Sequence, residues 1–231
     1  MLQETQPHAR SAAAPRGRRR PEPRSSYIDL PAPRLAGGKS LAESLRRRKT
    51  AREISAKKLP LQVLSNMLWA ACGVNRRQGP FGTPGITAAS ASNSQEVELY
   101  IAMEEGAYLF DARQHRLCAA TASDLRAMAI GPGQRDRMPK APIQIIYVAD
   151  LHRLSHTTGF QEPGLQDPEV QKSYYYVDTG MIASNVYLFA ASQGLAAWFH
   201  NCDRVGLAKK LRLRDDQRVL FGQTIGYPEG P

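Results

Sequence analysis

One long apolar segment constrains the fold of this chain more than any other feature. In residues 177–193, apolar side chains fall on nearly every face of a helical turn, and Gly194 follows, a residue type that commonly ends helices. A helix that is apolar on all sides leaves no face for solvent. The segment therefore predicts a helix in the middle of a core or between two subunits.

The segments around this helix indicate both strands and further helices. Strands are expected at residues 97–103 and 108–110, joined as a hairpin, and at 143–149, 195–199 and 218–226. Helices are expected after the capping-box residues Ser40 and Glu43, after Pro60, and at 205–213. Residues 151–170 contain two prolines and two glycines and are expected to form a loop or lid. The pattern predicts one α+β domain.

Positive charge is concentrated at the front of the chain. Residues 1–52 carry 13 Lys and Arg against 4 Asp and Glu, whereas the remaining 179 residues are close to neutral. Residues 1–35 are rich in Arg and Pro and poor in large apolar side chains, so most of this stretch is expected to be a disordered tail. Order is expected to begin near Ile28, and the folded domain is assigned to 36–231.

Several classes of protein are disfavoured by composition. No apolar run approaches the 18 residues of a membrane span, and no hydrophobic segment follows the N-terminal arginines as in a secretory signal. Cys72, Cys118 and Cys202 are far apart and odd in number, which favours a reducing, cytoplasmic compartment. His152 and His156 have helical spacing but no third ligand nearby, so a surface pair is expected and no metal site.

Three further segments carry chemistry-bearing residues. Residues 46–52 hold five basic side chains and a hydroxyl, a pattern suited to an anion such as phosphate. Residues 89–95 are small or amide-bearing and lead into a strand, so a planar ligand could approach the backbone closely. Residues 194–201 follow the long helix. Taken singly, these segments also fit a solvated helix end, a polar loop and core packing.

Together, in this order, the segments resemble the nitroreductase family of flavin mononucleotide (FMN) oxidoreductases. Residues 48–52 correspond to the family's Arg-Arg-Ser-x-Arg, and residues 89–95 to its Pro-Ser-Ala/Ser-x-Asn-x-Gln. Residues 178–180 and 190–195 match the Asp-x-Gly and Ala-x-x-x-Gly-Leu ends of its long helix. Residues 225–228, Ile-Gly-Tyr-Pro, are also typical. The resemblance covers residues 28–231.

The resemblance implies a nitroreductase-like fold, with a central mixed, mostly antiparallel sheet flanked by helices and an intertwined homodimer. FMN is expected at the subunit interface. Its implied binding residues are Arg48, Lys49, Thr50 and Arg52 for the phosphate and ribityl chain, Ser90, Ala91, Asn93 and Gln95 from the partner subunit, and His200 and Asn201 near the flavin ring. Because the sequence ends at Pro231, without the basic residue that many relatives carry beyond Gly-Tyr-Pro, the phosphate grip is expected to rest on residues 46–52.

The activity implied is ping-pong electron transfer from NAD(P)H through the flavin to a small acceptor of nitroaromatic or quinone type. The hairpin at residues 106–111 also resembles azoline-oxidising dehydrogenases, so oxidation without a nicotinamide step is an alternative. In that branch Lys172 and Tyr174 are candidate proton-transfer residues, although packing and hydrogen bonding of the consecutive tyrosines beside the long helix is the favoured interpretation. A non-enzymatic flavin-binding or nucleic-acid-binding protein is the second alternative, disfavoured by the balanced charge beyond residue 52.

Overall fold

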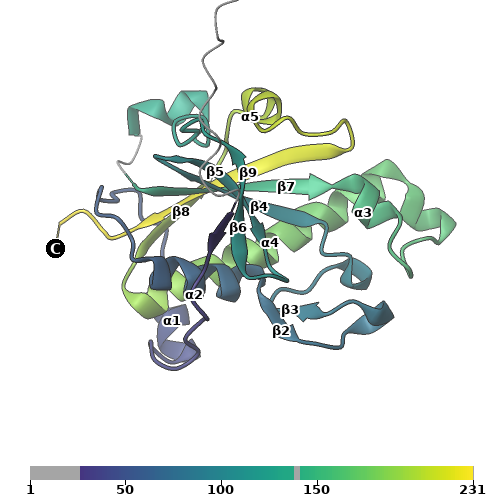
Figure 1. The fold of residues 1–231 in the computed structure, drawn as a ribbon, viewed down its shortest axis with the longest axis horizontal. Coiled ribbons are helices and arrows are strands. Elements are labelled where there is room, and N and C mark those ends of the chain that lie inside the picture. Colours follow the sequence, from purple (N-terminus) through teal and green to yellow (C-terminus); the bar gives the residue numbers. More distant parts are fainter. Residues whose placement is uncertain (1–26, 138–140, 231) are drawn as a thin grey trace, which may run out of the picture.

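The computed structural model of the protein describes residues 27–137 and 141–230. Its centre is an open seven-stranded sheet with the strand order β1-β6-β5-β4-β7-β9-β8, and every pairing in it is antiparallel (Figure 1). The strands are β1 Tyr27–Asp29, β4 Val97–Met103, β5 Gly106–Asp111, β6 Arg116–Thr121, β7 Ile143–Asp150, β8 Ala196–His200 and β9 Gln217–Gly226. A separate pair joins β2 Val74–Arg76 to β3 Gly85–Ile86.

Helices cover both faces of the sheet. They are α1 Leu41–Arg47, α2 Leu61–Cys72, α3 Leu151–Ser155, α4 Pro168–Gln193 and α5 Arg204–Leu211, with short 3-10 turns between them. In Figure 1, α4 runs along one face beside α1 and α2, and α5 lies on the opposite side. The sheet therefore separates two layers of helices.

Each face of the sheet has its own apolar core. On the α2 and α4 side, Met67 and Val186 pack against Tyr147 and the alternate inward residues of the strands. On the α5 side, Leu207 packs with Ile146 and the remaining alternate residues. This division explains why β7, whose eight residues are all buried, reads as a continuous apolar run.

The long helix was predicted correctly at its end but not at its start. Gly194 takes a left-handed conformation (φ 71°) and its N–H donates to Ala190 O, as expected of a terminating glycine. The helix begins at Pro168 instead of residue 177, because Asp167 accepts hydrogen bonds from two first-turn N–H groups and Pro168 occupies the first position. The first turns of the helix are polar, so a prediction based on apolar residues did not include them.

The remaining differences concern short elements. The predicted loop at 151–170 contains α3, and the short β2–β3 pair was not predicted. Strand β6 was not predicted, because its exposed Ala119 and Ala120 give no apolar alternation. The strands expected at 97–103, 143–149 and 218–226, the hairpin, and the helices after Ser40 and Pro60 are all present.

The N-terminal boundary lies earlier than residue 36. Strand β1 pairs with β6, placing Ile28 opposite Leu117, and Leu30 is buried in the core beyond it. Residues 27–35 thus belong to the domain, in line with order beginning near Ile28 but not with a tail extending to 35. The rest of the predicted tail, residues 1–26, lies outside the described residues.

Two expectations from composition concern the cysteines and the membrane. All three cysteines are free, and Cys72 and Cys202 are buried as expected of small apolar residues. Among the helices described, none combines the length and the apolarity needed to cross a bilayer.

Candidate cofactor site

A basic cavity of about 910 Å³ lies where the C-terminal half of α4 meets the first residues of β8. Three segments far apart in the sequence form it: the stretch after α1, the end of α4 with the start of β8, and residues 228–230. Its charged and polar lining residues are Arg46, Arg47, Lys49, Thr50, Arg52, Glu53, Tyr187 and Glu229. The volume is in the range of small-molecule and cofactor sites.

Local sequence explains how the basic stretch reaches the cavity. Helix α1 starts where Ser40 Oγ accepts the Glu43 N–H, and it ends at Arg47, with the Arg48 N–H donating to Ser44 O as a cap. The Ala51 N–H donates to Ala197 O at 2.9 Å, and Ile54 pairs with Pro228. The segment is therefore attached to β8 and to the end of β9, with its cations at the cavity.

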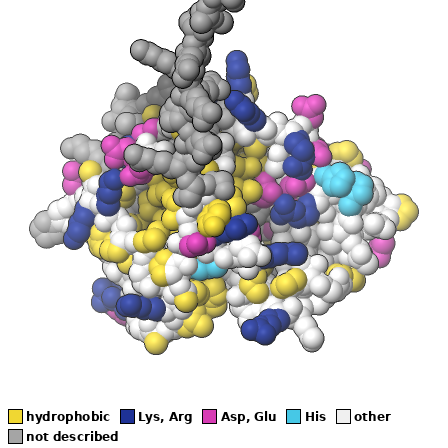
Figure 2. Space-filling model, viewed as in Figure 1, with side chains coloured by type: hydrophobic (Ala, Val, Ile, Leu, Met, Phe, Trp, Pro, Cys, Tyr) yellow, Lys and Arg dark blue, Asp and Glu magenta, His cyan; other side chains and the backbone are white. Residues whose placement is uncertain are grey.

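The predicted phosphate residues do not all play the same part. Lys49, Thr50 and Arg52 line the cavity, whereas the Arg48 guanidinium lies 5.5 Å from the centroid of the Tyr187 ring. Figure 2 shows Lys and Arg side chains gathered at the lower left, over α1. Arg48 thus contacts the cavity residue Tyr187 without lining the cavity itself.

Arg46 and Arg47, which had no assigned role in the sequence, also line the cavity. Both side chains bind the Glu43 carboxylate, and hydrogen bonds from these two guanidinium groups lower the pKa of Glu43 to about 2. Because Glu43 already neutralises part of their charge, the cavity cations without an ion-pair partner among the described residues are Lys49 and Arg52.

Tyr187 connects the basic stretch to β8. Its hydroxyl accepts the Phe199 N–H at 2.8 Å and lies 3.2 Å from Thr50 Oγ1. Since the hydroxyl accepts from the backbone, its own proton is available for Thr50, which leaves the Thr50 proton free for an anion in the cavity. Two residues after Thr50, the Arg52 guanidinium lies 5.6 Å from the Trp198 ring centroid. Sequence reasoning missed both aromatic supports.

The loop at residues 90–95 lies apart from this cavity, beside the first half of α4. Ser92, Asn93 and Gln95 all have left-handed backbone conformations, with φ of 49°, 57° and 52°. Non-glycine residues rarely adopt this region, and such strain persists only where the surroundings enforce it. Here hydrogen bonds enforce it: the Ala91 N–H donates to Asp178 Oδ2 at 2.9 Å, and Ser92 Oγ donates to Gly159 O at 3.0 Å.

The amide side chains predicted to contact flavin are engaged in building this loop. Asn93 Nδ2 donates to Thr83 O at 3.2 Å, and Gln95 Nε2 donates to Pro84 O at 2.6 Å. The Ser90 hydroxyl accepts the Gln95 N–H at 3.0 Å. These contacts fix the two amide groups in place, and both amide residues also line a second cavity of about 640 Å³.

A buried pair of carboxyl groups lies under the loop. Glu96 is fully buried directly after Gln95, and Asp178 of α4 is 4% exposed. Burial and the nearby Asp178 raise the pKa of Glu96 to about 7, and burial also raises the pKa of Asp178. Neither residue stands out in the sequence as part of an acidic pair, because 82 positions separate them.

His200 and Asn201, predicted near the flavin ring, do not line the cavity. His200 is buried, with Nε2 2.9 Å from Thr224 Oγ1 and Nδ1 2.9 Å from Asn201 O. Burial lowers the pKa of His200 to about 4, so its ring is neutral at physiological pH. Asn201 is exposed in the turn that follows β8.

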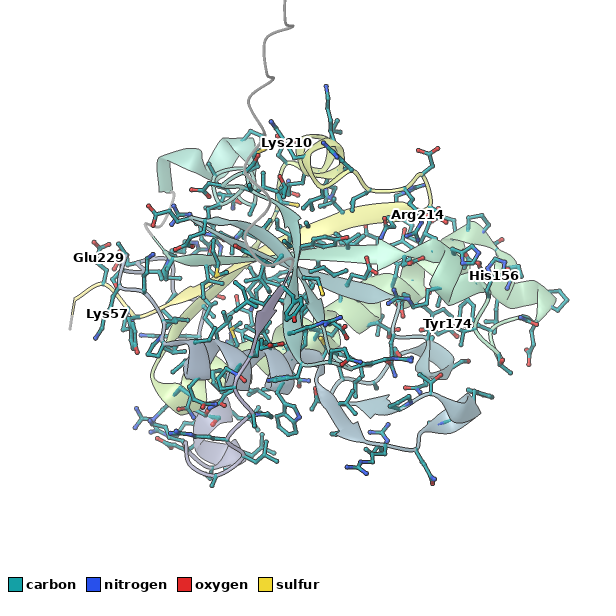
Figure 3. All side chains as sticks on the ribbon, viewed as in Figure 1. Lys57, His156, Tyr174, Lys210, Arg214 and Glu229 are labelled. Atoms are coloured by element: carbon teal, nitrogen blue, oxygen red, sulfur yellow. The ribbon has the colours of Figure 1, made fainter. Side chains whose placement is uncertain are left out.

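Lys172 and Tyr174 lie at the opposite end of the molecule from the cavity. Figure 3 places Tyr174 and His156 at one end of the sheet and Glu229, a cavity residue, at the other. Lys172 is exposed beside Glu169, and Tyr174 packs edge-on against Phe160. The two residues therefore do not meet the basic cavity within one chain.

The two histidines of α3 form a stacked surface pair. The centroids of the His152 and His156 rings lie 3.9 Å apart, the angle between the ring planes is 10°, and both residues are exposed. Within the described ranges, no group of three or more His, Cys, Asp or Glu is placed to hold a metal ion.

The fold and the cavity define an α+β protein that presents a basic cavity at the end of its central helix. A model of the nitroreductase family matches residues 45–227, and the chain belongs to this family of oxidoreductases, which are generally flavin-dependent.

Individual relatives agree with this assignment. The chain is 28% identical over 162 residues to a Methanocaldococcus jannaschii protein described as a nitroreductase, covering 67% of this chain and 75% of that protein. A crystal structure from Ralstonia eutropha JMP134, also described as a nitroreductase, is 33% identical and superimposes with a TM-score of 0.78, covering 89% of this chain and 91% of that one. The E. coli microcin synthetase complex shares the fold at 14% identity and a TM-score of 0.63, covering 88% of this chain and 78% of that one.

Proposed function

We propose that the protein is a homodimeric FMN-dependent oxidoreductase. The observation that carries this proposal is the basic cavity in which Lys49, Thr50 and Arg52 converge at the end of α4 in a member of the nitroreductase family. A phosphate monoester is dianionic or nearly so at neutral pH, and Lys and Arg bind it through charge-assisted hydrogen bonds. Free flavins without a phosphate would not use these cations.

Each cavity residue has a part in holding the phosphate end of FMN. The Lys49 ammonium and Arg52 guanidinium bind and neutralise the phosphate, and the Thr50 hydroxyl donates to it because Tyr187 supplies Thr50 with a hydrogen bond. Trp198 keeps the Arg52 guanidinium oriented by stacking. Bound FMN supplies the two-electron redox chemistry, while the protein fixes its position and excludes water.

The exposed face of α4 supports a dimer. Val177 is 54% exposed and Met181 is 42% exposed, although both are apolar and lie in the middle of the longest helix. Between them, a Cβ added to Gly180 would meet no atom within 4 Å, so nothing in one protomer requires a glycine here. A helix of a second copy crossing at Gly180 would explain all three residues.

A two-fold axis at this point of α4 would also complete the site. The loop at residues 90–95 is attached at Asp178, on one side of Gly180, and the cavity begins at Tyr187, on the other side. Two antiparallel copies of α4 crossing near Gly180 would bring the loop of each copy toward the cavity of the other. Ser90 and Ala91 of that loop would then cover the flavin, and the turn at His200 and Asn201 would face its ring.

We further propose NAD(P)H as the electron donor and a small nitroaromatic or quinone as the acceptor. The family membership and its oxidoreductase relatives support this choice. The three free cysteines fit a reducing compartment, which supports a cytoplasmic location.

Absorbance spectroscopy tests the proposal directly. The purified protein, or the protein reconstituted with FMN, is expected to show bound flavin that bleaches when NADPH is added anaerobically. The double variant Lys49→Ala/Arg52→Ala is expected to bind FMN about 100-fold more weakly while its affinity for riboflavin, which lacks the phosphate, stays the same.

The matched control is Lys210→Ala, which removes one exposed cation of α5, far from the cavity (Figure 3). It is expected to bind FMN as the unsubstituted protein does. Equal FMN affinity in the control and in the double variant would show that the phosphate does not occupy this cavity, and protein that takes up no flavin would refute the proposal.

A further inference from the structure

Glu96 is the most unusual polar residue in the described part of the chain. Its side chain is fully buried, and Ser94 Oγ donates to Glu96 Oε2 at 2.6 Å. The other oxygen, Oε1, is buried and receives no hydrogen bond from any described residue. An ionised carboxylate with one unsatisfied oxygen in a core is costly, so a proton is expected on or near this group.

Asp178 is the neighbour that can share such a proton. Its buried carboxyl group holds the same loop, because its Oδ2 accepts the Ala91 N–H at 2.9 Å, and its negative charge adds to burial in raising the Glu96 pKa. Two ionised carboxylates have no hydrogen to place between them, whereas one protonated and one ionised carboxyl group form a strong, charge-assisted bond. The pair therefore fits a state with one proton and one negative charge.

No cation takes the place of this proton in the described residues around the pair. Arg153 of α3, which donates to Gln95 O at 2.8 Å beside Glu96 in the chain, binds Glu98 at 2.7 Å and approaches Asp150 at 3.6 Å. The charged groups of the adjoining elements are thus paired with one another. Asp178 is the charged side chain that acts on Glu96, and it raises the Glu96 pKa.

We propose that Glu96 and Asp178 are positioning residues that hold the loop at 90–95 in its binding conformation through one shared proton. The loop is clamped at both ends by the pair, through the Ala91 N–H on Asp178 and through Ser94 on Glu96. Between these clamps lie the left-handed residues Ser92 and Asn93, whose strain would relax once the clamps loosen.

The shared proton makes the loop sensitive to alkaline pH. Above the Glu96 pKa of about 7, both carboxyl groups ionise, and two adjacent buried charges repel each other. The Asp178 side chain then moves away and releases the Ala91 N–H. That this loop covers FMN rests on the function proposed above, whereas the clamp itself belongs to the chain without any ligand.

Glu96→Gln and Asp178→Asn test the clamp. Each substitution places an amide where the shared proton lies, so the hydrogen bond no longer depends on pH, while the second carboxyl keeps one negative charge. In the ligand-free protein, hydrogen exchange of the peptide covering residues 88–97 is measured from pH 6 to pH 9, corrected for intrinsic exchange. Protection is expected to fall above pH 7 in the unsubstituted protein and to stay constant in both variants.

FMN affinity gives the second readout. Relative to Glu96→Gln, the unsubstituted protein is expected to bind FMN about tenfold more weakly at pH 8 than at pH 6, because the competent fraction falls about tenfold with a pKa near 7. The FMN phosphate titrates in the same way with both proteins, so its effect cancels when the affinity of the unsubstituted protein is divided by that of Glu96→Gln at each pH.

The two readouts separate the clamp from the cofactor. Equal pH dependence of exchange in the unsubstituted protein and in both variants would overturn the clamp, whatever FMN does. A clamp confirmed by exchange in a protein that binds no FMN would instead remove the proposed function and leave the shared proton in place.

Discussion

At the scale of single residues, Tyr187 determines how the cavity presents its donors. The hydroxyl satisfies the Phe199 N–H and contacts Thr50, and the ring stacks under Arg48. One side chain thus sets the orientation of a hydroxyl, a guanidinium and a strand backbone. Its contribution comes from these partners and not from direct contact with a reacting atom.

Tyr187→Phe is expected to lower the free energy of unfolding by about 1–2 kcal/mol, because the Phe199 N–H loses its acceptor. It is also expected to weaken FMN binding severalfold, since Thr50 loses the partner that orients it. Urea denaturation and fluorescence titration measure the two effects. Tyr108→Phe, which removes a hydroxyl that has no hydrogen bond among those described, is the control and should change neither quantity; a similar loss in both variants would contradict the role of Tyr187.

The residues of the site were predictable where they form local motifs. Lys49, Thr50 and Arg52 lie within one short stretch, so their spacing made them candidates, and all three line the cavity. Tyr187, Asp178 and Glu96 could not be identified in this way, because their partners lie 137 and 82 positions away and each residue type has an ordinary structural interpretation. Only the fold brings these partners together.

At the scale of elements, α4 links every part of the site. In chain order, it carries the exposed Val177, the Asp178 clamp, the exposed Met181 and the Tyr187 support. At about 1.5 Å per residue, the 26-residue helix is roughly 40 Å long, and these four residues lie within roughly 15 Å of it. Helix α4 therefore packs in the core and also contributes residues to the loop attachment, to the exposed apolar strip at Val177 and Met181, and to the cavity.

Gly180→Leu is expected to prevent dimer formation, because the glycine leaves space for a crossing helix that a leucine side chain would fill. Analytical ultracentrifugation is expected to show monomers at concentrations where the unsubstituted protein is dimeric, with FMN affinity lost in parallel. Gly164→Leu introduces the same side chain at another open position and should leave the mass unchanged. A dimeric Gly180→Leu variant would place the interface elsewhere.

Helices and strands were predictable where their buried positions give a clear apolar pattern in the sequence. Strand β7 and the apolar half of α4 were clear because both lie between packed layers. Strand β6 escaped prediction because two exposed alanines interrupt its apolar alternation, and α3 because its five residues lie within a segment rich in turn-forming residues. The order of the strands in the sheet could not be obtained from such local patterns at all.

At the scale of the whole molecule, two buried groups of opposite character shape the pH dependence of stability. The Glu96 pKa is raised to about 7 from 4.5, so the folded state binds an extra proton in this window and stability falls as pH rises. The His200 pKa is lowered to about 4 from 6.5, so the folded state lacks a proton there and stability falls as pH decreases. Between pH 4.5 and 6.5 the two slopes cancel.

Single substitutions are expected to expose the two slopes separately. In Glu96→Gln, the free energy of unfolding should rise with pH by about 1.4 kcal/mol per unit between pH 4.5 and 6.5, relative to the unsubstituted protein. In His200→Asn it should fall by a similar amount per unit, although the lost Thr224 hydrogen bond lowers the whole curve. Urea denaturation at each pH measures both; parallel curves for all three proteins would contradict the assignment.

The attachment of residues 51–55 to both β8 and the end of β9 has a consequence for the kinetics of folding. The Glu229 N–H donates to Glu53 O at 3.0 Å, so the cavity is closed by contacts between nearly opposite ends of the described chain. Contacts of such long sequence separation carry the largest loop-closure cost and tend to form after the transition state. An anion bound there would therefore slow unfolding and leave the folding rate almost unchanged, so that loading the cavity sets the lifetime of the native state more than the speed of reaching it.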